Sequence, residues 1–252
     1  MSALRAKCPD CRTLTAVALD GDYQCHSCGR EFAAGLLRVC SAWGVGGDGM
    51  KEGATLPLDW PDAGLVEAAT LEQQVHAVAE QLPHRPLVLG GCCCSHVGAI
   101  RRLAERHGRL AVVWLDAHGD LNTPESSPSG DAWGMALRMA IDEDSVRPAD
   151  VALVGARNLD PSEVDYTRSV GIDDDIARAL ADTDAVYVAL DLDVLRPGEA
   201  DVFFPEPGGP ALAEVEALLR GLPRVDGLGL SGHLGSERNV GPLTRLARAA
   251  GL

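Results

Sequence analysis

The 252-residue sequence is poor in aromatic side chains, which make up 4% of it, and poor in positive charge. Against 37 Asp and Glu residues it carries only 22 Lys and Arg residues, which gives a formal net charge of -15 at pH 7. Binding to DNA or RNA usually needs a concentration of Lys and Arg on one surface. The composition therefore argues against nucleic acid as a main partner.

Long apolar runs are missing as well. No segment approaches the roughly 18 apolar residues of a membrane-spanning helix, and the first residues, MSALRAKCPD, contain no apolar signal core. We therefore expect no membrane partner and a cytoplasmic location. In a reducing compartment, the eight cysteines are better explained as metal ligands, catalytic groups or small buried side chains than as disulfides.

The first set of cysteines forms two CxxC pairs, Cys8 and Cys11 followed by Cys25 and Cys28. Between the pairs, an apolar stretch with an Asp-Gly turn signal at 20–21 predicts a hairpin that brings the four thiolates together. Four thiolates suit a tetrahedral ion, so we predict a zinc ribbon over residues 1–36, held by structural Zn(II). The alternative is a pair of redox motifs, although neither CxxC opens a helix after a strand.

From residue 37 to residue 252, continuous apolar runs alternate with segments of helical periodicity. The strand candidates are LLRVCSAWGV, RPLVLGG, RLAVVWLDAHGD, ADVALVGA, DAVYVALDLD and VDGLGLSG. Unbroken apolarity indicates strands that are covered on both faces, as in a parallel sheet between two helix layers. Among the helices, one is expected to start after Thr70 and another to stop at Gly221. Residues 37–252 are thus predicted to form a three-layer α/β/α domain with a mainly parallel sheet.

Acidic side chains gather at two of the predicted strand ends, where such sheets place their active sites. Asp116, His118 and Asp120 are spaced by two, so that in an extended segment they point the same way. Asp191 and Asp193 repeat that spacing. These carboxylates cannot all be ionised in a dry crevice without cations between them. The set favours manganese or a similar divalent ion over the alternative that the acids only cap helices.

Around these residues the sequence resembles the ureohydrolase family, which comprises arginases, agmatinases and formiminoglutamases. DAHGDLNTPESSPSG and ALDLDVLRPGEADVFFPEPGG are similar to the family's two metal-binding motifs. The resemblance implies an arginase/deacetylase-like fold, two Mn(II) ions, and a bridging hydroxide that attacks the central carbon of a small guanidino or amidine substrate. It implies metal ligands at Asp116, His118, Asp120, Asp191 and Asp193. Asp120, which orients the hydroxide and takes its proton, and His118 are the implied catalytic residues.

The resemblance also implies substrate-binding residues. Asn122 and Ser129 match positions that hold the substrate's α-carboxylate in arginases, and Asp131 stands where that branch has Asn. Asp160 matches an acidic position that meets the substrate's amino group. Trp133 stands in place of a proton-shuttling histidine and is expected to line the pocket.

The stretch LGGCCCSHVG, residues 89–98, departs from the family's Gly-Gly-Asp-His-Ser loop. Aligning the glycines puts Cys93 at the position of the ligand histidine, with His96 three residues later as the alternative ligand. A thiolate at that position shifts the metal preference toward Zn or Fe. Gly232 stands where the simplest register expects the glutamate that grips the guanidinium, and Phe204 stands where a small hydroxyl residue is usual.

These departures argue against an arginine-specific enzyme. We expect instead a metal-dependent hydrolase of linear C–N bonds that acts on a smaller or flatter guanidino or amidine compound. Two alternatives stay open: a catalytically silent metal-binding relative that serves as a binding or regulatory module, and a redox or metal sensor built on Cys92, Cys93 and Cys94. Because the family often forms oligomers, a homo-oligomer is a further expectation.

Overall fold

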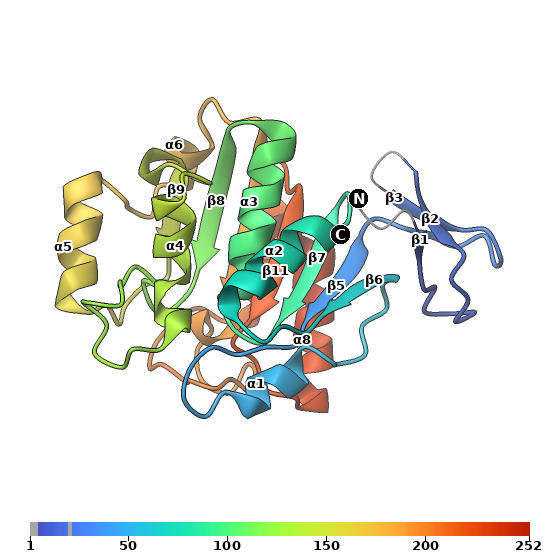
Figure 1. The fold of residues 1–252 in the computed structure, drawn as a ribbon, viewed down its shortest axis with the longest axis horizontal. Coiled ribbons are helices and arrows are strands. Elements are labelled where there is room, and N and C mark those ends of the chain that lie inside the picture. Colours follow the sequence, from blue (N-terminus) through green and yellow to red (C-terminus); the bar gives the residue numbers. More distant parts are fainter. Residues whose placement is uncertain (1–4, 20–21) are drawn as a thin grey trace.

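The computed structural model describes residues 5–19 and 22–252, so the predicted Asp-Gly turn at 20–21 lies outside the described residues. Two sheets are present, a small one near the N-terminus and a large one in the body of the molecule (Figure 1). The small sheet is antiparallel, in the order β1-β2-β3-β4. Its strands are β1 (Arg5–Ala6), β2 (Ala16–Leu19), β3 (Asp22–Cys25) and β4 (Glu31–Phe32).

The small sheet is attached to one edge of the large sheet. Lys7 and Asp62 exchange backbone hydrogen bonds of 2.8 and 3.0 Å. Tyr23, which is fully buried, packs over Gly35, where an added Cβ would lie 2.8 Å from the tyrosine ring. The two sheets are therefore joined by backbone pairing and by one buried aromatic contact.

The large sheet has seven strands in the order β6-β5-β7-β11-β10-β8-β9, and its strand pairs are parallel. The strands are β5 (Gly35–Val39), β6 (Asp62–Val66), β7 (Pro86–Gly90), β8 (Leu110–Leu115), β9 (Val151–Val154), β10 (Ala185–Asp191) and β11 (Gly227–Ser231). Each predicted apolar run contains one of these strands, which confirms the parallel sheet. The edge strand β6 was not predicted; only Val66 of its five residues is buried.

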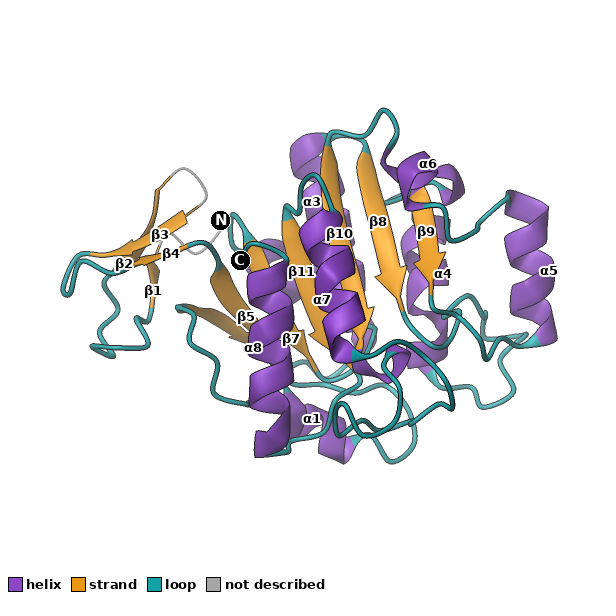
Figure 2. Cartoon of the chain, turned by 180° about the vertical axis from the view of Figure 1, so that it is seen from behind, coloured by secondary structure: helices purple, strands orange, loops and turns teal. Residues whose placement is uncertain are grey.

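Helices cover both faces of the large sheet. They are α1 (Asp48–Gly53), α2 (Leu71–Gln81), α3 (Ser95–His107), α4 (Ala136–Asp142), α5 (Pro161–Val170), α6 (Ile176–Leu180), α7 (Leu212–Gly221) and α8 (Val240–Ala249). Helices α2, α3 and α4 lie on one face, and α7 and α8 lie on the other (Figure 2). The three-layer prediction is confirmed. So are the start of α2, where Thr70 Oγ1 accepts from the Gln73 backbone N–H, and the end of α7 at Gly221.

Two apolar clusters, one on each face, form the packing between the large sheet and its helix layers. On the α3 face, Trp114 of β8 packs with Ile100 and other buried residues, and on the α7 face Leu190 of β10 packs with Leu219. Burying one large apolar side chain completely stabilises the fold by about 1.5–3 kcal/mol relative to leaving it exposed. Packing of this kind gives a rigid sheet, and the loops at its strand ends are the natural carriers of a functional site.

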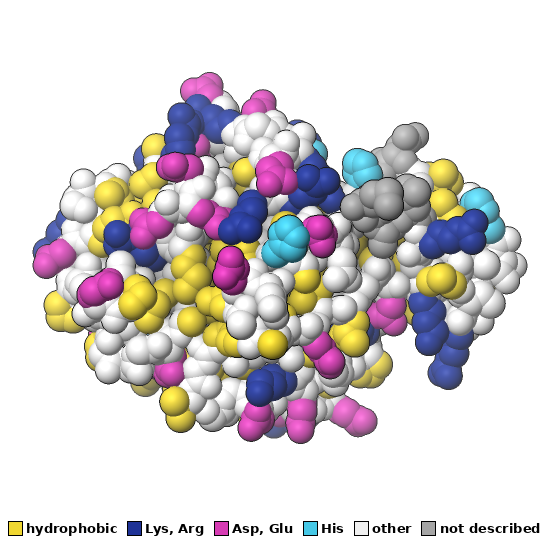
Figure 3. Space-filling model, in the orientation of Figure 1, with side chains coloured by type: hydrophobic (Ala, Val, Ile, Leu, Met, Phe, Trp, Pro, Cys, Tyr) yellow, Lys and Arg dark blue, Asp and Glu magenta, His cyan; other side chains and the backbone are white. Residues whose placement is uncertain are grey.

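The outer surface of the α2 and α3 layer mixes acidic and basic side chains (Figure 3). Several of them pair at short range, as Arg102 does with Glu105 at 2.9 Å and Arg138 with Asp142 at 2.7 Å. Exposed pairs of this type contribute little to stability individually. Among the described residues, none of the helices has the length and apolar character needed to cross a membrane.

Candidate metal centre

Four neighbouring strands of the large sheet, β7, β11, β10 and β8, end around one cavity of about 360 Å³. Asp191 is the last residue of β10, and Asp116 follows β8 directly. After β7 the chain turns through Gly90 and Gly91 before α3 begins. An added Cβ would lie 2.0 Å from Ser95 Oγ at Gly90 and 2.5 Å from the Ser41 carbonyl oxygen at Gly91. The glycine pair thus permits the tight turn that brings the cysteine run to the same edge as the carboxylates.

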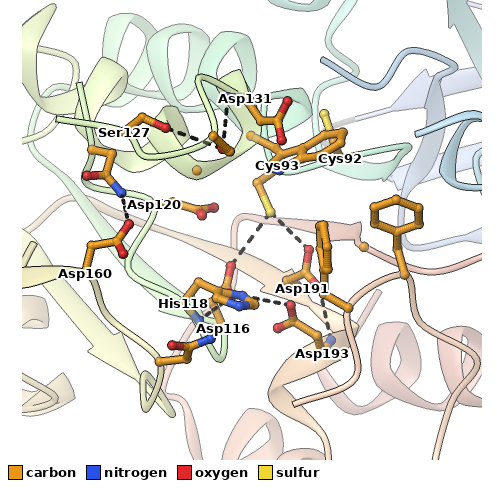
Figure 4. Close-up of a pocket in the computed structure, with 18 of the residues that line it drawn as sticks. Cys92, Cys93, Asp116, His118, Asp120, Ser127, Asp131, Asp160, Asp191 and Asp193 are labelled. Atoms are coloured by element: carbon orange, nitrogen blue, oxygen red, sulfur yellow. Dashed lines mark hydrogen bonds and ion pairs between the residues drawn. The ribbon is translucent and has the colours of Figure 1, made fainter. Parts of the chain in front are cut away.

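The predicted ligands form two groups of donor atoms that share one residue. The first group is Cys93, Asp116 and Asp191, and the second is Asp116, His118 and Asp193. Cys93 Sγ lies 3.0 Å from Asp191 Oδ2 and 3.7 Å from Asp116 Oδ2 (Figure 4). His118 Nδ1 lies 3.0 Å from Asp193 Oδ2 and 3.4 Å from Asp116 Oδ1. A carboxylate shared between two groups is the arrangement that a bridged pair of ions requires.

Asp120 faces the same cavity and carries an unpaired oxygen. Its side chain is buried, its backbone has a φ of 52°, and its Oδ2 has no hydrogen-bond partner among the described residues. A buried carboxylate oxygen without a partner is costly, and a left-handed backbone at a non-glycine residue adds to that cost. Both costs fit a cation bound at this oxygen, so the residues present are suited to a divalent metal.

Without cations, the cluster holds protons. Burial, and then the charge of Asp193, raise the pKa of Asp191 to about 7; burial and the charge of Asp116 do the same for Asp193. Burial and the charge of Asp120 raise the pKa of Cys93 well above its ordinary value. For His118, burial lowers the pKa, but hydrogen bonds to Asp116 and Asp193 outweigh it and raise the pKa to about 12. Metal binding at such a cluster is expected to release protons.

His96, the alternative to Cys93, is fully buried and is separated from the acidic cluster by Ser231. Its Nδ1 lies 3.0 Å from the Tyr187 hydroxyl and its Nε2 lies 3.1 Å from Ser231 Oγ. Burial lowers the pKa of this imidazole to about 3. The structure therefore brings Cys93, and not His96, into contact with the acidic cluster.

The substrate-binding residues predicted from the resemblance all line the cavity: Asn122, Ser129, Asp131, Trp133 and Asp160. Two of them bind each other, because Asn122 Nδ2 donates to Asp160 Oδ2 at 2.8 Å. The Asn122 Oδ1 atom accepts from the hydroxyls of Ser126 and Ser162, each at 2.9 Å. Most of the hydrogen-bonding capacity of Asn122 is thus used within the protein.

One side of the cavity is an aromatic wall formed by Trp133, Phe203 and Phe204. The rings meet edge to face, with centroid separations of 4.5 Å for Phe203 and Phe204, 5.8 Å for Trp133 and Phe203, and 5.9 Å for Trp133 and Phe204. Trp133 lies against Gly44, where an added Cβ would be 2.4 Å from the indole ring. Trp133 and Phe204 stood out in the sequence as departures from the family, whereas Phe203 did not.

Two lining glutamates were also missed. Glu206 Oε1 lies 3.4 Å from His118 Nε2 and accepts a hydrogen bond of 3.0 Å from Asn158 Nδ2. Glu163 is buried and accepts hydrogen bonds from the backbone N–H groups of Leu121 and Asp160. It therefore fixes the end of the loop over residues 116–121, which carries Asp116, His118 and Asp120. Glu206 belongs to the quoted motif PEPGG, but nothing in its spacing indicates that it faces His118.

The four N-terminal cysteines form a separate cluster in the small sheet, with all donor atoms within 4.8 Å of one another. Cys8 Sγ lies 3.8 Å from Cys28 Sγ, and Cys11 Sγ lies 3.5 Å from Cys25 Sγ. Tetrahedral Zn–S bonds of about 2.3 Å place sulfurs roughly 3.8 Å apart. A hydrogen bond with the Thr15 hydroxyl lowers the pKa of Cys25 to about 6, whereas burial raises the pKa of Cys8 to about 12, so without a cation the four thiols differ in charge. The geometry fits structural zinc, and zinc binding itself stays a prediction.

The comparisons with known proteins converge on one family. The arginase family model matches residues 17–231. An arginase from Bacillus caldovelox is 33% identical over 168 residues, which cover 54% of this chain and 56% of that protein. The chain therefore spans about half the length of the curated relatives it matches.

Solved structures agree on the fold. The crystal structure of arginase from Bacillus subtilis has a TM-score of 0.73 at 24% identity, covering 86% of this chain and 97% of that one. Proclavaminate amidino hydrolase from Streptomyces clavuligerus has a TM-score of 0.68 at 23% identity, covering 86% and 88%. Both acidic strand ends, at 116–120 and 191–193, fall inside the matched family region. The chain belongs to the arginase family.

Proposed function

We propose that this protein is a metal-dependent hydrolase of linear C–N bonds in a small guanidino or amidine compound, and that it is not specific for arginine. One observation carries the proposal: two groups of metal-ligating side chains share Asp116 at the end of a cavity at the strand ends. Membership of the arginase family supports the same reaction class.

The ligands proposed for two Mn(II) ions are Cys93, Asp116, His118, Asp120, Asp191 and Asp193. When bound, divalent ions of this kind lower the pKa of water toward neutrality and polarise the carbon under attack. Because Cys93 offers a soft sulfur, Zn or Fe is an option at its position. Asp120 is also the residue proposed to orient the attacking water and accept its proton, through the carboxylate oxygen that does not bind a cation.

The proposed substrate is a flat cation. Among the described residues that line the cavity, none is Lys or Arg, and the charged ones are carboxylates apart from His118. The faces of aromatic rings attract a planar, delocalised cation such as a guanidinium or amidinium, and the aromatic wall lines this cavity. Glu206 is the carboxylate proposed to bind that cation, because it borders the cavity beside His118 and its side chain is 22% exposed.

Among the described residues that line this cavity, none is a Lys or Arg that could bind the carboxylate of an amino-acid substrate. Asn122, the residue matched to that role, already bonds to Asp160, and several other carboxylates line the same cavity. A substrate without a carboxylate avoids this repulsion. The contacts of Asn122 thus support the proposal that arginine is not the preferred substrate.

A catalytically silent metal-binding relative is the second candidate, favoured by one specific observation. At Gly232, an added Cβ would lie 1.9 Å from Asp191 Oδ1, so a glutamate here, where the simplest register places the family's guanidinium ligand, would clash with the Asp191 carboxylate as it now lies. With Trp133 also standing in for the proton-shuttling histidine, two groups that assist catalysis in the family are replaced.

The test combines metal analysis with a substrate screen. Purified protein is loaded with Mn(II), its metal content is measured, and guanidino, formimino and ureido compounds are screened for release of urea, formamide or ammonia. We expect two ions beyond the zinc of the ribbon, and product release that is lost in Asp191→Asn and kept in Asp165→Asn, a change at an exposed residue of α5. Two bound ions without turnover of any compound would favour the silent relative. No bound ion would refute the metal centre itself.

A further inference from the structure

A row of polar side chains lies beneath the candidate metal centre, inside the protein. It consists of Tyr187 on β10, His96 in the first turn of α3, and Ser231 at the end of β11, and none of the three has any exposed surface. The contacts run in sequence: Tyr187 hydroxyl to His96 Nδ1 at 3.0 Å, His96 Nε2 to Ser231 Oγ at 3.1 Å, and Ser231 Oγ to Asp191 Oδ2 at 3.1 Å. We call these residues the buried polar row.

Hydrogen counting gives the row a direction. The Tyr187 hydroxyl has one hydrogen and lies 3.0 Å from His96 Nδ1, which accepts that hydrogen in one tautomer of the ring. If Nδ1 accepts, the ring hydrogen of a neutral imidazole is on Nε2, which then donates to Ser231 Oγ. The hydroxyl hydrogen of Ser231 is left for Asp191 Oδ2. Each member of the row thus decides which way the next one donates.

The fold makes room for this row at a glycine. At Gly229 of β11, an added Cβ would lie 2.2 Å from the Tyr187 hydroxyl oxygen and 2.3 Å from His96 Nδ1. A side chain at this position would therefore push the tyrosine and the histidine apart. The ring of His96 is also held edge-on against Trp114, at a centroid separation of 5.4 Å. Trp114 in turn donates to Asp116 Oδ2 at 3.3 Å.

The end of the row lies where the first group of ligands meets. Asp191 Oδ2 accepts from Ser231 and lies 3.0 Å from Cys93 Sγ, while Asp191 Oδ1 accepts from the backbone N–H of Asp193 at 3.0 Å. Ser231 Oγ also lies 3.4 Å from Cys93 Sγ. If the Ser231 hydroxyl turned away, Asp191 would lose the hydrogen bond at Oδ2 from Ser231 and keep the one at Oδ1 from the Asp193 backbone N–H.

We propose that His96 is a positioning residue, which acts through Ser231 to hold Asp191 and Cys93 in the orientation that binds the first ion. The inference rests on the metal centre of the proposed function. It assigns to His96 a role distinct from ligation, and it gives Tyr187 the task of setting the direction of the row. Partners of this kind behind metal ligands commonly change metal affinity 10- to 100-fold when removed, about the size of effect expected here.

The test measures the binding of Co(II) to the full chain after the N-terminal cysteine cluster has been filled with Zn(II), so that the cobalt–thiolate band reports on Cys93. Ser231→Ala and Tyr187→Phe each remove a single oxygen, and His96→Gln removes the ring; Tyr166→Phe on α5, which lies outside the row, is the matched control. Two quantities are recorded, the affinity for Co(II) by competition with a chelator and the near-ultraviolet absorption band that a cysteine thiolate gives when it binds cobalt. Thermal unfolding of each metal-free variant is measured alongside, which separates lost affinity from lost folding.

We expect Ser231→Ala and His96→Gln to weaken Co(II) binding about 10- to 100-fold and to weaken or shift the thiolate band, with a smaller effect for Tyr187→Phe and none for Tyr166→Phe. Folded variants of the row that bind Co(II) as tightly as the wild type, with the same band, would overturn the inference alone. A wild-type protein that binds no Co(II) outside the ribbon would overturn both the inference and the proposed metal centre.

Discussion

Replacing Gly232 by alanine should damage both stability and metal binding, for a reason that can be worked out from the structure. Gly232 has a φ of +72°, and a residue with a Cβ pays about 1–2 kcal/mol for this left-handed backbone. The new Cβ would also lie 1.9 Å from Asp191 Oδ1 and 2.2 Å from Asp191 Oδ2, so the carboxylate must turn away. It would then lose its hydrogen bonds from the Asp193 N–H and from Ser231 Oγ.

The magnitude follows from these contacts. Two hydrogen bonds to a charged group contribute roughly 1.5–3 kcal/mol each, so with the backbone cost the free energy of unfolding should fall by about 4–8 kcal/mol, less whatever relaxation recovers. Because whole domains are stable by about 5–15 kcal/mol, a loss of this size is severe. The same turn of Asp191 removes a proposed ligand, so the metal content of the first position should fall as well.

The assay is urea unfolding with metal analysis on the same preparations. Gly171→Ala is the matched control, because Gly171 has a similar φ of +77° but nothing within 4 Å of an added Cβ. It should show the backbone cost alone, about 1–2 kcal/mol, with full metal content. If Gly232→Ala loses no more stability than Gly171→Ala and keeps its metal, Asp191 does not lie where this reasoning requires.

Two further substitutions test the cysteine clusters. Cys93→His should raise Mn(II) occupancy, because imidazole is a better ligand than thiolate for this ion, and Cys93→Ala should lower it; unchanged occupancy in both variants, measured by elemental analysis, would show that the thiol is not a ligand. Cys28→Ser should abolish zinc binding and expose the small sheet to protease, whereas Cys40→Ser, outside both clusters, should do neither; a protease-resistant small sheet without zinc would contradict a metal-held ribbon.

The layered architecture was predictable because buried parallel strands leave a direct trace in sequence. The run LAVVWL of β8 is apolar on both faces since helices cover both, and the other central strands read the same way. Strand β6 lacks that trace. It lies at the sheet edge next to the small sheet, most of its residues are partly exposed, and Gly64 stands at its centre, where an added Cβ would lie 2.9 Å from the Leu37 side chain.

The candidate metal ligands could be grouped from sequence for a related reason. Carboxyl ends of parallel strands lie at one edge of a sheet, so acids that follow two such strands converge whatever the loops do. Side chains carried by long connections have no such constraint. Phe203 and Glu206 reach the cavity on the segment between Val194 and α7, and only the folded path of that segment brings them to Trp133 and His118.

Which of Cys93 and His96 faces the cluster also could not be settled from spacing, because Cys93 lies in the turn before α3 and His96 lies only three residues later, in the first turn of the helix. The deciding feature lies in another strand: Gly229 of β11 has no side chain, and the His96 ring occupies the space that a side chain there would fill. With the imidazole placed there, the sulfur of Cys93 is the side-chain donor of this turn that lies against the carboxylates.

Two glycines, Gly229 within β11 and Gly232 directly after it, thus leave space for side chains on opposite sides of the strand. Gly229 leaves space below the strand for His96 and Tyr187, and Gly232 leaves space above it for the Asp191 carboxylate. A glutamate at position 232 would occupy the space of Asp191, so this backbone cannot both keep that ligand and grip a guanidinium from β11. If the substrate is the cation proposed above, the carboxylate that binds it must then come from another element, and Glu206, beside His118 in the same cavity, meets that requirement. The end of β11 would then account for both proposed departures, the one at the first metal position and the one in the substrate site.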